Sequence, residues 1–351
     1  VVRGVYDDPN DPGAINHFQA LSAALSGTVG LGNIGGVALA IALGGPGAIF
    51  WMWIVGFLGM SIKFVEVTLS MLYRNTDDPD NPHGGPMWVA GRALKRMKPE
   101  LGWLGTALAF LFSFTVMVSS GTGGNMFQAW NVADVTTEYF GVAGWISGAV
   151  LTVVVGAVLL GGIKRIGKVA GTLVPAMVLI YVIAGSYVLF ANFGQIPEML
   201  GLIITSAFVP TEATGAFVGG TVGSAFLFGM KRAIFSNEAG QGSSAIAHAA
   251  AKTDEPVREG LVGGMEPFID TIVVCTFTAL IILSTGIWNR APDIAFESVP
   301  QAVQSEDGWS FPDTPLGPGD WTEQQGLLVV VSADENIATG QDIHRIGGSV
   351  T

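Results

Sequence analysis

The sequence Ser-Gly-Thr-Val-Gly-Leu-Gly-Asn-Ile-Gly-Gly, residues 26–36, interrupts an apolar segment that extends from about residue 15 to residue 43. Glycine weakens a helix by roughly 0.5–1 kcal/mol relative to alanine and leaves neighbouring backbone amides and carbonyls uncovered. At membrane depth, uncovered backbone groups are tolerated only where they are buried in protein or line a cavity. The stretch therefore predicts a broken helix whose backbone faces a ligand.

Two other interpretations of these glycines compete with the first. Gly30-x-Gly32-x-x-Gly35 has the spacing of the dinucleotide-binding fingerprint, which needs a preceding strand and an acidic residue about twenty residues later. No carboxylate follows before Glu66, so we reject that interpretation. Gly32 and Gly36 also form a small-xxx-small pair that would let two helices approach closely, and this role is compatible with a ligand-facing break.

The composition indicates a membrane protein. Half of the 351 residues are hydrophobic, 13% are charged and the mean hydropathy is +0.51, whereas soluble domains carry roughly 25% charged residues. The apolar segments are long and continuous rather than short and alternating, so helices are expected to cross the bilayer. We predict an all-α integral membrane protein, surrounded by lipid and without a nucleic-acid partner.

Seven spans are expected between residues 15 and 286, after a polar segment at 1–14 and before a tail at 287–351. The first span (15–43) and the sixth (213–235) contain glycine breaks, and a cytoplasmic helix capped by Ser236 is expected at 237–251. Lys63 and Glu66, three residues apart, are expected to pair on one helix face. The other spans are expected at 49–73, 101–130, 142–160, 169–190 and 261–286.

The loops give the orientation. With the N-terminus inside, eleven Lys and Arg residues fall on the inner side, and only Arg290 and Arg345 fall outside. Because cytoplasmic loops carry the excess of basic residues, the N-terminus is predicted to be cytoplasmic and the tail external. Residues 291–351 of that tail hold ten carboxylates and one base, Arg345, a net charge of −9 out of the −12 of the whole chain.

The two broken spans are separated by five spans and run in opposite directions under this topology. An inverted repeat of five-helix units gives this arrangement, with a binding site at mid-membrane between the two interruptions. Such a repeat requires ten spans. Three are therefore expected to be missing after the seventh, and the tail is expected to be a truncated external loop.

Several motifs then resemble the alanine or glycine:cation symporter family, which are sodium-coupled amino-acid carriers of LeuT-type fold. The resemblance covers about residues 17–286, with the motifs in the family's order. Residues 29–33, Val-Gly-Leu-Gly-Asn, also look like the pentapeptide in the first broken helix of the neurotransmitter:sodium symporters. The motifs are Phe18-Gln19-Ala20-Leu21, Gly30-x-Gly32-Asn33-Ile34, Gly44-Gly45-Pro46-Gly47-Ala48-Ile49-Phe50-Trp51-Met52-Trp53, Gly84-Gly85-Pro86-Met87, Gly161-Gly162-Ile163-Lys164 and Phe235-Ser236-Asn237-Glu238-Ala239-Gly240.

The resemblance implies sodium-coupled symport of alanine or glycine across the cell membrane by alternating access. The substrate carboxylate needs free amides at the start of a half-helix, and its ammonium needs carbonyls or neutral oxygens. By analogy, Gln128 lines the site and sodium is bound by the carbonyls of Ser26 and Val29. The substrate-binding candidates are Leu31, Gly32, Asn33, Gln128, Gly219, Gly223 and Ser224.

Two departures from the family pattern matter. Leu31 stands where many members have threonine, so a hydroxyl is lost there. The family's eighth span, which is expected to complete the substrate and sodium sites, is absent, so the chain as it stands is expected not to transport.

Three alternatives stay open beside the sodium symporter. A proton-coupled transporter is disfavoured because the two broken regions hold no carboxylate or histidine. An enzyme would need a nucleophile, an acid–base pair or a metal cluster. The nearest constellation is His248 with Ser243 and Ser244, which we expect at the surface, and no enzyme is predicted. A non-transporting amino-acid receptor is the third.

Overall fold

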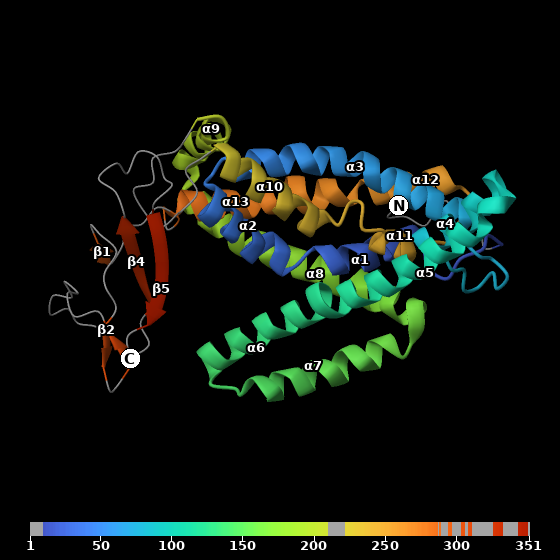
Figure 1. Ribbon diagram of the computed structural model, residues 1–351, viewed down its shortest axis with the longest axis horizontal. Coiled ribbons are helices and arrows are strands. Elements are labelled where there is room, and N and C mark those ends of the chain that lie inside the picture. Colours follow the sequence, from blue (N-terminus) through green and yellow to red (C-terminus); the bar gives the residue numbers. More distant parts are fainter. Residues whose placement is uncertain are drawn as a thin grey trace. The chain divides into compact units, whose positions relative to one another are not determined.

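The computed structural model describes residues 10–209, 222–286 and Trp288, together with five short strands in the C-terminal segment. The helices pack into two compact units, each built from segments that are far apart in the sequence. Unit 1 comprises Val1–Ile34, Ile54–Ala184 and Ala233–Cys275, and unit 2 comprises Gly35–Trp53, Gly185–Arg232 and Thr276–Thr351. Figure 1 shows the elements of both units along the chain.

The first apolar segment forms two helices, α1 (His17–Thr28) and α2 (Leu31–Gly44), bent by 41° at a short break. The start of α1 is fixed by a capping box. The Asn16 side chain accepts from the Gln19 amide at 2.8 Å, and the Gln19 side chain accepts from the Asn16 amide at 3.1 Å. The break falls within the glycine-rich stretch.

Most of unit 1 consists of long apolar helices. Helix α3 (Ala48–Tyr73) begins in unit 2 and continues into unit 1, and α8 (Gly162–Ala191) runs from unit 1 into unit 2. The sequence between these two helices contains α4 (Pro86–Met97), η1 (Pro99–Leu101), α5 (Gly102–Ser119), the π-helix η2 (Ser120–Met126), α6 (Phe127–Phe140) and α7 (Gly144–Leu159). Helix α4 packs against α5, and α6 packs against α7, alongside which it runs in Figure 1.

The end of unit 1 contains the last residues of α10 (Val222–Asn237), from Ala233 on, followed by α11 (Ser243–His248), α12 (Pro256–Gly264) and the π-helix η4 (Phe268–Cys275). The predicted helix at 237–251 is shorter than expected, and Ser236 is not its cap. Ser236 lies inside α10, and Gly242 caps α11 instead. The turn between the helices contains positive φ values at Glu238, Gly240 and Gly242, which end the preceding helix.

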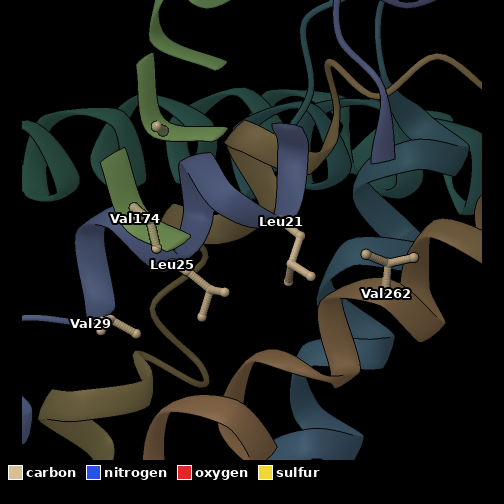
Figure 2. Packing of buried hydrophobic residues seen from close by; sticks show 6 residues of the cluster. Leu21, Leu25, Val29, Val174 and Val262 are labelled. Atoms are coloured by element: carbon tan, nitrogen blue, oxygen red, sulfur yellow. The ribbon is translucent and has the colours of Figure 1, made fainter. Parts of the chain in front are cut away.

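A buried apolar cluster holds α1 in unit 1. Figure 2 shows Leu21, Leu25 and Val29 on α1 and its end, near Val174 of α8 and Val262 of α12. Leu21, Leu25 and Val29 are spaced four residues apart, so they lie on one face of the helix. This packing fixes the helix end that leads into the break.

Unit 2 contains the start of α3, η3 (Phe193–Gln195), α9 (Ile196–Ser206), the first part of α10 and α13 (Thr276–Ser284). Aromatic rings pack edge to face in this unit, with Phe50 and Phe208 at 5.0 Å and Trp51 and Phe226 at 5.0 Å between ring centroids. Gly229 lets α10 approach α3 closely, because a Cβ there would lie 2.3 Å from the Ala48 carbonyl oxygen.

The tail departs from the all-α prediction, because it contains short strands. Strand β4 pairs in parallel with β1 and antiparallel with β5, and β2 pairs antiparallel with β3. The all-α description therefore applies to the helical part up to residue 286. The strands are β1 (Ile294–Phe296), β2 (Val303–Ser305), β3 (Gly308–Ser310), β4 (Gly326–Ser332) and β5 (Ile343–Ser349).

Four helical stretches in the described residues are long and apolar enough to cross a membrane, and the bent pair α1–α2 makes up to five. The predicted fourth span is the shorter apolar helix α7, and the predicted sixth lies partly outside the described residues. Large apolar side chains on these helices are exposed, as a lipid-facing surface requires. The four stretches are Ala48–Tyr73, Pro99–Phe140, Gly162–Ala191 and Pro256–Ser284. The chain is thus a multi-pass membrane protein.

Candidate functional site

Asn33 forms hydrogen bonds that fix the backbone at the break between α1 and α2. Helix α1 ends at Thr28, and Val29 has an extended backbone with φ −78° and ψ 107°. The Asn33 side-chain oxygen accepts from the Gly30 amide at 2.7 Å, and the Asn33 amide donates to the Gly30 carbonyl at 3.1 Å. Asn33 therefore caps the start of α2 from within its own first turn, and its own amide is not available to a ligand.

The two helix ends at this break carry opposite partial charges. The last carbonyls of a helix have no amide four residues ahead within it, and the helix dipole makes that end negative. At the end of α1, the Leu25 carbonyl accepts from the Val29 amide at 2.7 Å, and the later carbonyls, including that of Ser26, lie beyond the helical ladder. The first amides of α2, at Leu31 and Gly32, form the positive end. One end suits a cation and the other an anion.

A small pocket opens at the break. Its cavity volume is about 60 Å³, which is on the scale of a few water-sized positions. The pocket combines residues of the interruption and of the start of α2 with residues of α8 and η4, all within unit 1. It is lined by Val29, Gly30, Asn33, Ile34, Met177, Val178, Tyr181 and Val274.

A buried carboxylate meets the break from η4. The Asn33 side-chain nitrogen donates to Asp270 Oδ1 at 2.6 Å. The hydroxyls of Ser236 and Thr271 donate to Asp270 Oδ2 at 2.6 Å and 2.9 Å. Asp270 is fully buried, and among the described residues its contacts are neutral donors rather than ion-pair partners. A buried carboxylate without a counter-charge is the chemistry of a cation or proton site.

Sequence reasoning missed Asp270 because it searched for ionisable groups only inside the two broken segments. The available signal was a carboxylate in the middle of the apolar run Phe268–Cys275, where an ionisable residue is a functional candidate by default. Cys275 is also buried, and its sulfur lies 3.3 Å from the Asn33 side-chain nitrogen. Asn33 thus contacts three residues, Ser236, Asp270 and Cys275, that lie more than 200 positions further along the chain.

The other predicted site residues are distributed over both units. Gln128 lies on α6 in unit 1, half-buried and two residues after the π-helix η2. Ser26 is exposed and Val29 is buried. Gly219 lies outside the described residues. Gly223 and Ser224 belong to unit 2 and stand in the first turn of α10.

Comparison with known proteins gives a family for these features. The chain matches the sequence model of the sodium:alanine symporter family over residues 1–312. It is 46% identical over 282 residues to the sodium/alanine symporter AgcS of Methanococcus maripaludis, covering 80% of this chain and 60% of that protein. Two Bacillus subtilis proteins are 38% identical.

Those two relatives differ in the solute and cation that their names state. One is a putative sodium/proton-dependent alanine carrier protein, YrbD, matched over 80% of this chain and 56% of its own length. The other is a probable sodium/glutamine symporter, GlnT, matched over 83% of this chain and 58% of its own length. The chain thus spans about 60% of the length of the curated relatives that it matches.

Proposed function

Since the chain belongs to the sodium:alanine symporter family, we propose that the protein carries out sodium-coupled symport of small neutral amino acids, alanine or glycine, by alternating access. The observation that carries the proposal is the pocket at the α1–α2 break, with helix ends of opposite partial charge on either side of Val29 and Gly30. A zwitterion coupled to a cation needs this pair of environments.

The substrate carboxylate binds the first amides of α2, at Leu31 and Gly32, because that helix end is positive. Gln128 supplies a side-chain amide that can donate and accept hydrogen bonds. Alanine and glycine match the scale of a pocket of about 60 Å³, and larger side chains would require it to widen. Asn33 acts by shaping the break rather than by offering its backbone amide.

Sodium binds at the end of α1 through the carbonyls of Ser26 and Val29, which the helix dipole makes favourable for a cation. A sodium ion at this end would order the break and thereby raise substrate affinity. By linkage, the substrate must then raise sodium affinity by the same factor. The helices belong to a LeuT-type inverted repeat in the cell membrane, with a cytoplasmic N-terminus supported by the distribution of Lys and Arg in the loops.

Uptake by vesicles tests this function. The complete protein is placed in membrane vesicles, and entry of labelled alanine is followed under an inward sodium gradient. Gln128→Ala is expected to reduce uptake at least tenfold, whereas the control Gln195→Ala, at an exposed position, leaves it unchanged. Competition with unlabelled glycine, serine and glutamine ranks the substrates. If a folded protein binds alanine but shows no uptake under any cation gradient, the transporter proposal is wrong and a receptor function takes its place.

Proton coupling is the second candidate function, and Asp270 is the observation that favours it. The sequence argument against protons rested on the lack of carboxylates in the broken segments, and the fold brings Asp270 to 2.6 Å from Asn33. A proton could neutralise this buried carboxylate as a metal cation could. Uptake driven by a proton gradient without sodium, and lost in Asp270→Asn, would establish this alternative.

A further inference from the structure

Five ionisable side chains form a continuous buried chain in unit 1, apart from the pocket at the break. It starts at the first residue of α1 and continues through α12 and α11 to α3. Four of the five side chains are fully buried, and His17 is 4% exposed. In order of contact they are His17, Glu259, His248, Glu266 and Lys63.

His248 stands at the centre of this chain, between two carboxylates. Its Nδ1 lies 2.5 Å from Glu259 Oε1, and its Nε2 lies 2.5 Å from Glu266 Oε1. The second oxygen of Glu259 contacts His17 Nδ1. The second oxygen of Glu266 lies 3.2 Å from Lys63 Nζ, and Ser244 Oγ donates to both oxygens of Glu266. The sequence placed His248 at the surface and paired Lys63 with Glu66. The fold buries His248 and pairs Lys63 with Glu266.

The two contacts of His248 determine how many protons this cluster must hold. A neutral imidazole carries one N–H, and two ionised carboxylates facing its two nitrogens require two. Both short contacts are therefore hydrogen bonds only when the cluster holds one proton more than neutral His248 with two carboxylates. With that proton, His248 and Lys63 balance Glu259 and Glu266. Without it, these four buried side chains carry one more negative than positive charge, which burial makes unfavourable.

Other charged groups face the same cluster from neighbouring positions. Arg74, directly after α3, interacts with Glu259 and also with Asp11 and Asp254. Glu66 and Asp270 both lie within electrostatic range of Glu266. Burial alone would lower the pKa of His248, and the charge of Glu266 with the hydrogen bonds to Glu259 and Glu266 raises it instead to about 9.

We propose that His248, Glu259 and Glu266 form a proton-binding site that fastens the beginning of α1 to α11 and α12, and that loss of this proton releases that end of α1. His17 is the link, because it is the first residue of α1 and contacts Glu259. The break at Thr28 lies about 17 Å further along the same helix. The proton thus acts as a second ligand of the protein, at a site distinct from the pocket.

The site predicts a dependence of stability on pH whose sign is fixed. Because the pKa of His248 in the folded protein lies above its ordinary value of 6.5, the stabilisation is complete below about pH 6.5 and is lost as the pH rises through about 9. The melting temperature of the complete protein in detergent is therefore expected to fall between pH 7 and pH 10. ¹⁵N spectra of histidine-labelled protein should show an imidazolium at pH 7 that titrates near pH 9.

Variants separate this site from general effects of alkali. His248→Gln should remove the fall in melting temperature and the titrating resonance. Glu259→Gln takes away one of the two carboxylates, so the midpoint should move to lower pH by at least one unit. His83→Gln, at an exposed histidine, should behave as the unchanged protein. A neutral imidazole at pH 7 in the unchanged protein would overturn the proposal even if the His248 variant fails to fold. So would an unaltered pH profile in His248→Gln.

The consequence for transport rests on the proposed function. If α1 moves during symport, sodium-driven alanine uptake should show the same midpoint near pH 9, and Glu259→Gln should shift both midpoints together. A pH-independent uptake rate in a protein whose histidine titrates as expected would confirm the proton site and exclude its control over α1. Failure of uptake at every pH would count against the symporter and leave the spectroscopic result intact.

Discussion

Replacing Asn33 by alanine tests the organisation of the break directly. The side chain of Asn33 makes contacts in two directions. Its oxygen accepts from the Gly30 amide at 2.7 Å, and its nitrogen donates to Asp270 Oδ1 at 2.6 Å and to Ser236 Oγ at 3.1 Å. Asn33 is 1% exposed, so water cannot easily replace these partners.

The contacts set the magnitude. A hydrogen bond to a charged group contributes about 1.5–3 kcal/mol, and loss of a helix cap costs about 1 kcal/mol. Asn33→Ala is therefore expected to lower the free energy of unfolding by about 3 kcal/mol. Ser236 and Thr271 still donate hydrogen bonds to Asp270 in this variant. The loss of unfolding free energy should therefore stay below the roughly 5 kcal/mol that marks exceptional substitutions.

The assay is denaturant unfolding of the purified complete protein in mixed micelles, followed by tryptophan fluorescence. Asn131→Ala is the matched control, because Asn131 is half-buried and donates an exposed hydrogen bond to the Phe127 carbonyl of its own helix, so its loss should change the free energy by less than about 0.5 kcal/mol. Sodium-driven uptake measured in parallel should be lost in Asn33→Ala and kept in the control. A loss of stability below about 1 kcal/mol with normal uptake would refute the assignment of Asn33 as the residue that organises the break.

Three further predictions concern packing and the buried carboxylate. Gly229→Ala places a Cβ 2.3 Å from the Ala48 carbonyl oxygen and should destabilise the protein by about 1–3 kcal/mol in the same unfolding assay. Gly148→Ala adds a Cβ that meets no described atom within 4 Å beyond its own helix backbone and should stabilise the protein by up to about 1 kcal/mol. Equal effects of the two substitutions would contradict the close approach at Gly229. Asp270→Asn keeps the shape of the site and removes its charge, so the rise in melting temperature caused by added cation should shrink; an unchanged rise would show that the charge of Asp270 does not contribute to cation binding. Trp53→Phe removes the 2.6 Å hydrogen bond to the Thr276 hydroxyl and should cost about 1 kcal/mol, and an unaltered unfolding midpoint would argue against that bond.

The family and the membrane class could be predicted from the sequence, and the family match confirms the resemblance. Motifs and composition are properties of the chain itself, so no folding is needed to observe them. The break at residues 27–33 was also predictable, because glycine weakens a helix locally. The hydrogen bonds within the break could not be predicted in the same way. The sequence assigned the Asn33 backbone amide to the substrate, whereas in the structure it donates to the Gly30 carbonyl.

Only the tertiary structure decided which charged groups meet. The sequence paired Lys63 with Glu66, because a pattern along one helix can reveal only neighbours three or four residues apart. The fold instead places Glu266 at 3.2 Å from Lys63, across roughly 200 residues of chain. The same applies to Asp270 beside Asn33 and to His248 between Glu259 and Glu266. In a low-dielectric interior these groups are stable only when paired, so helix packing determines their protonation, and local sequence cannot.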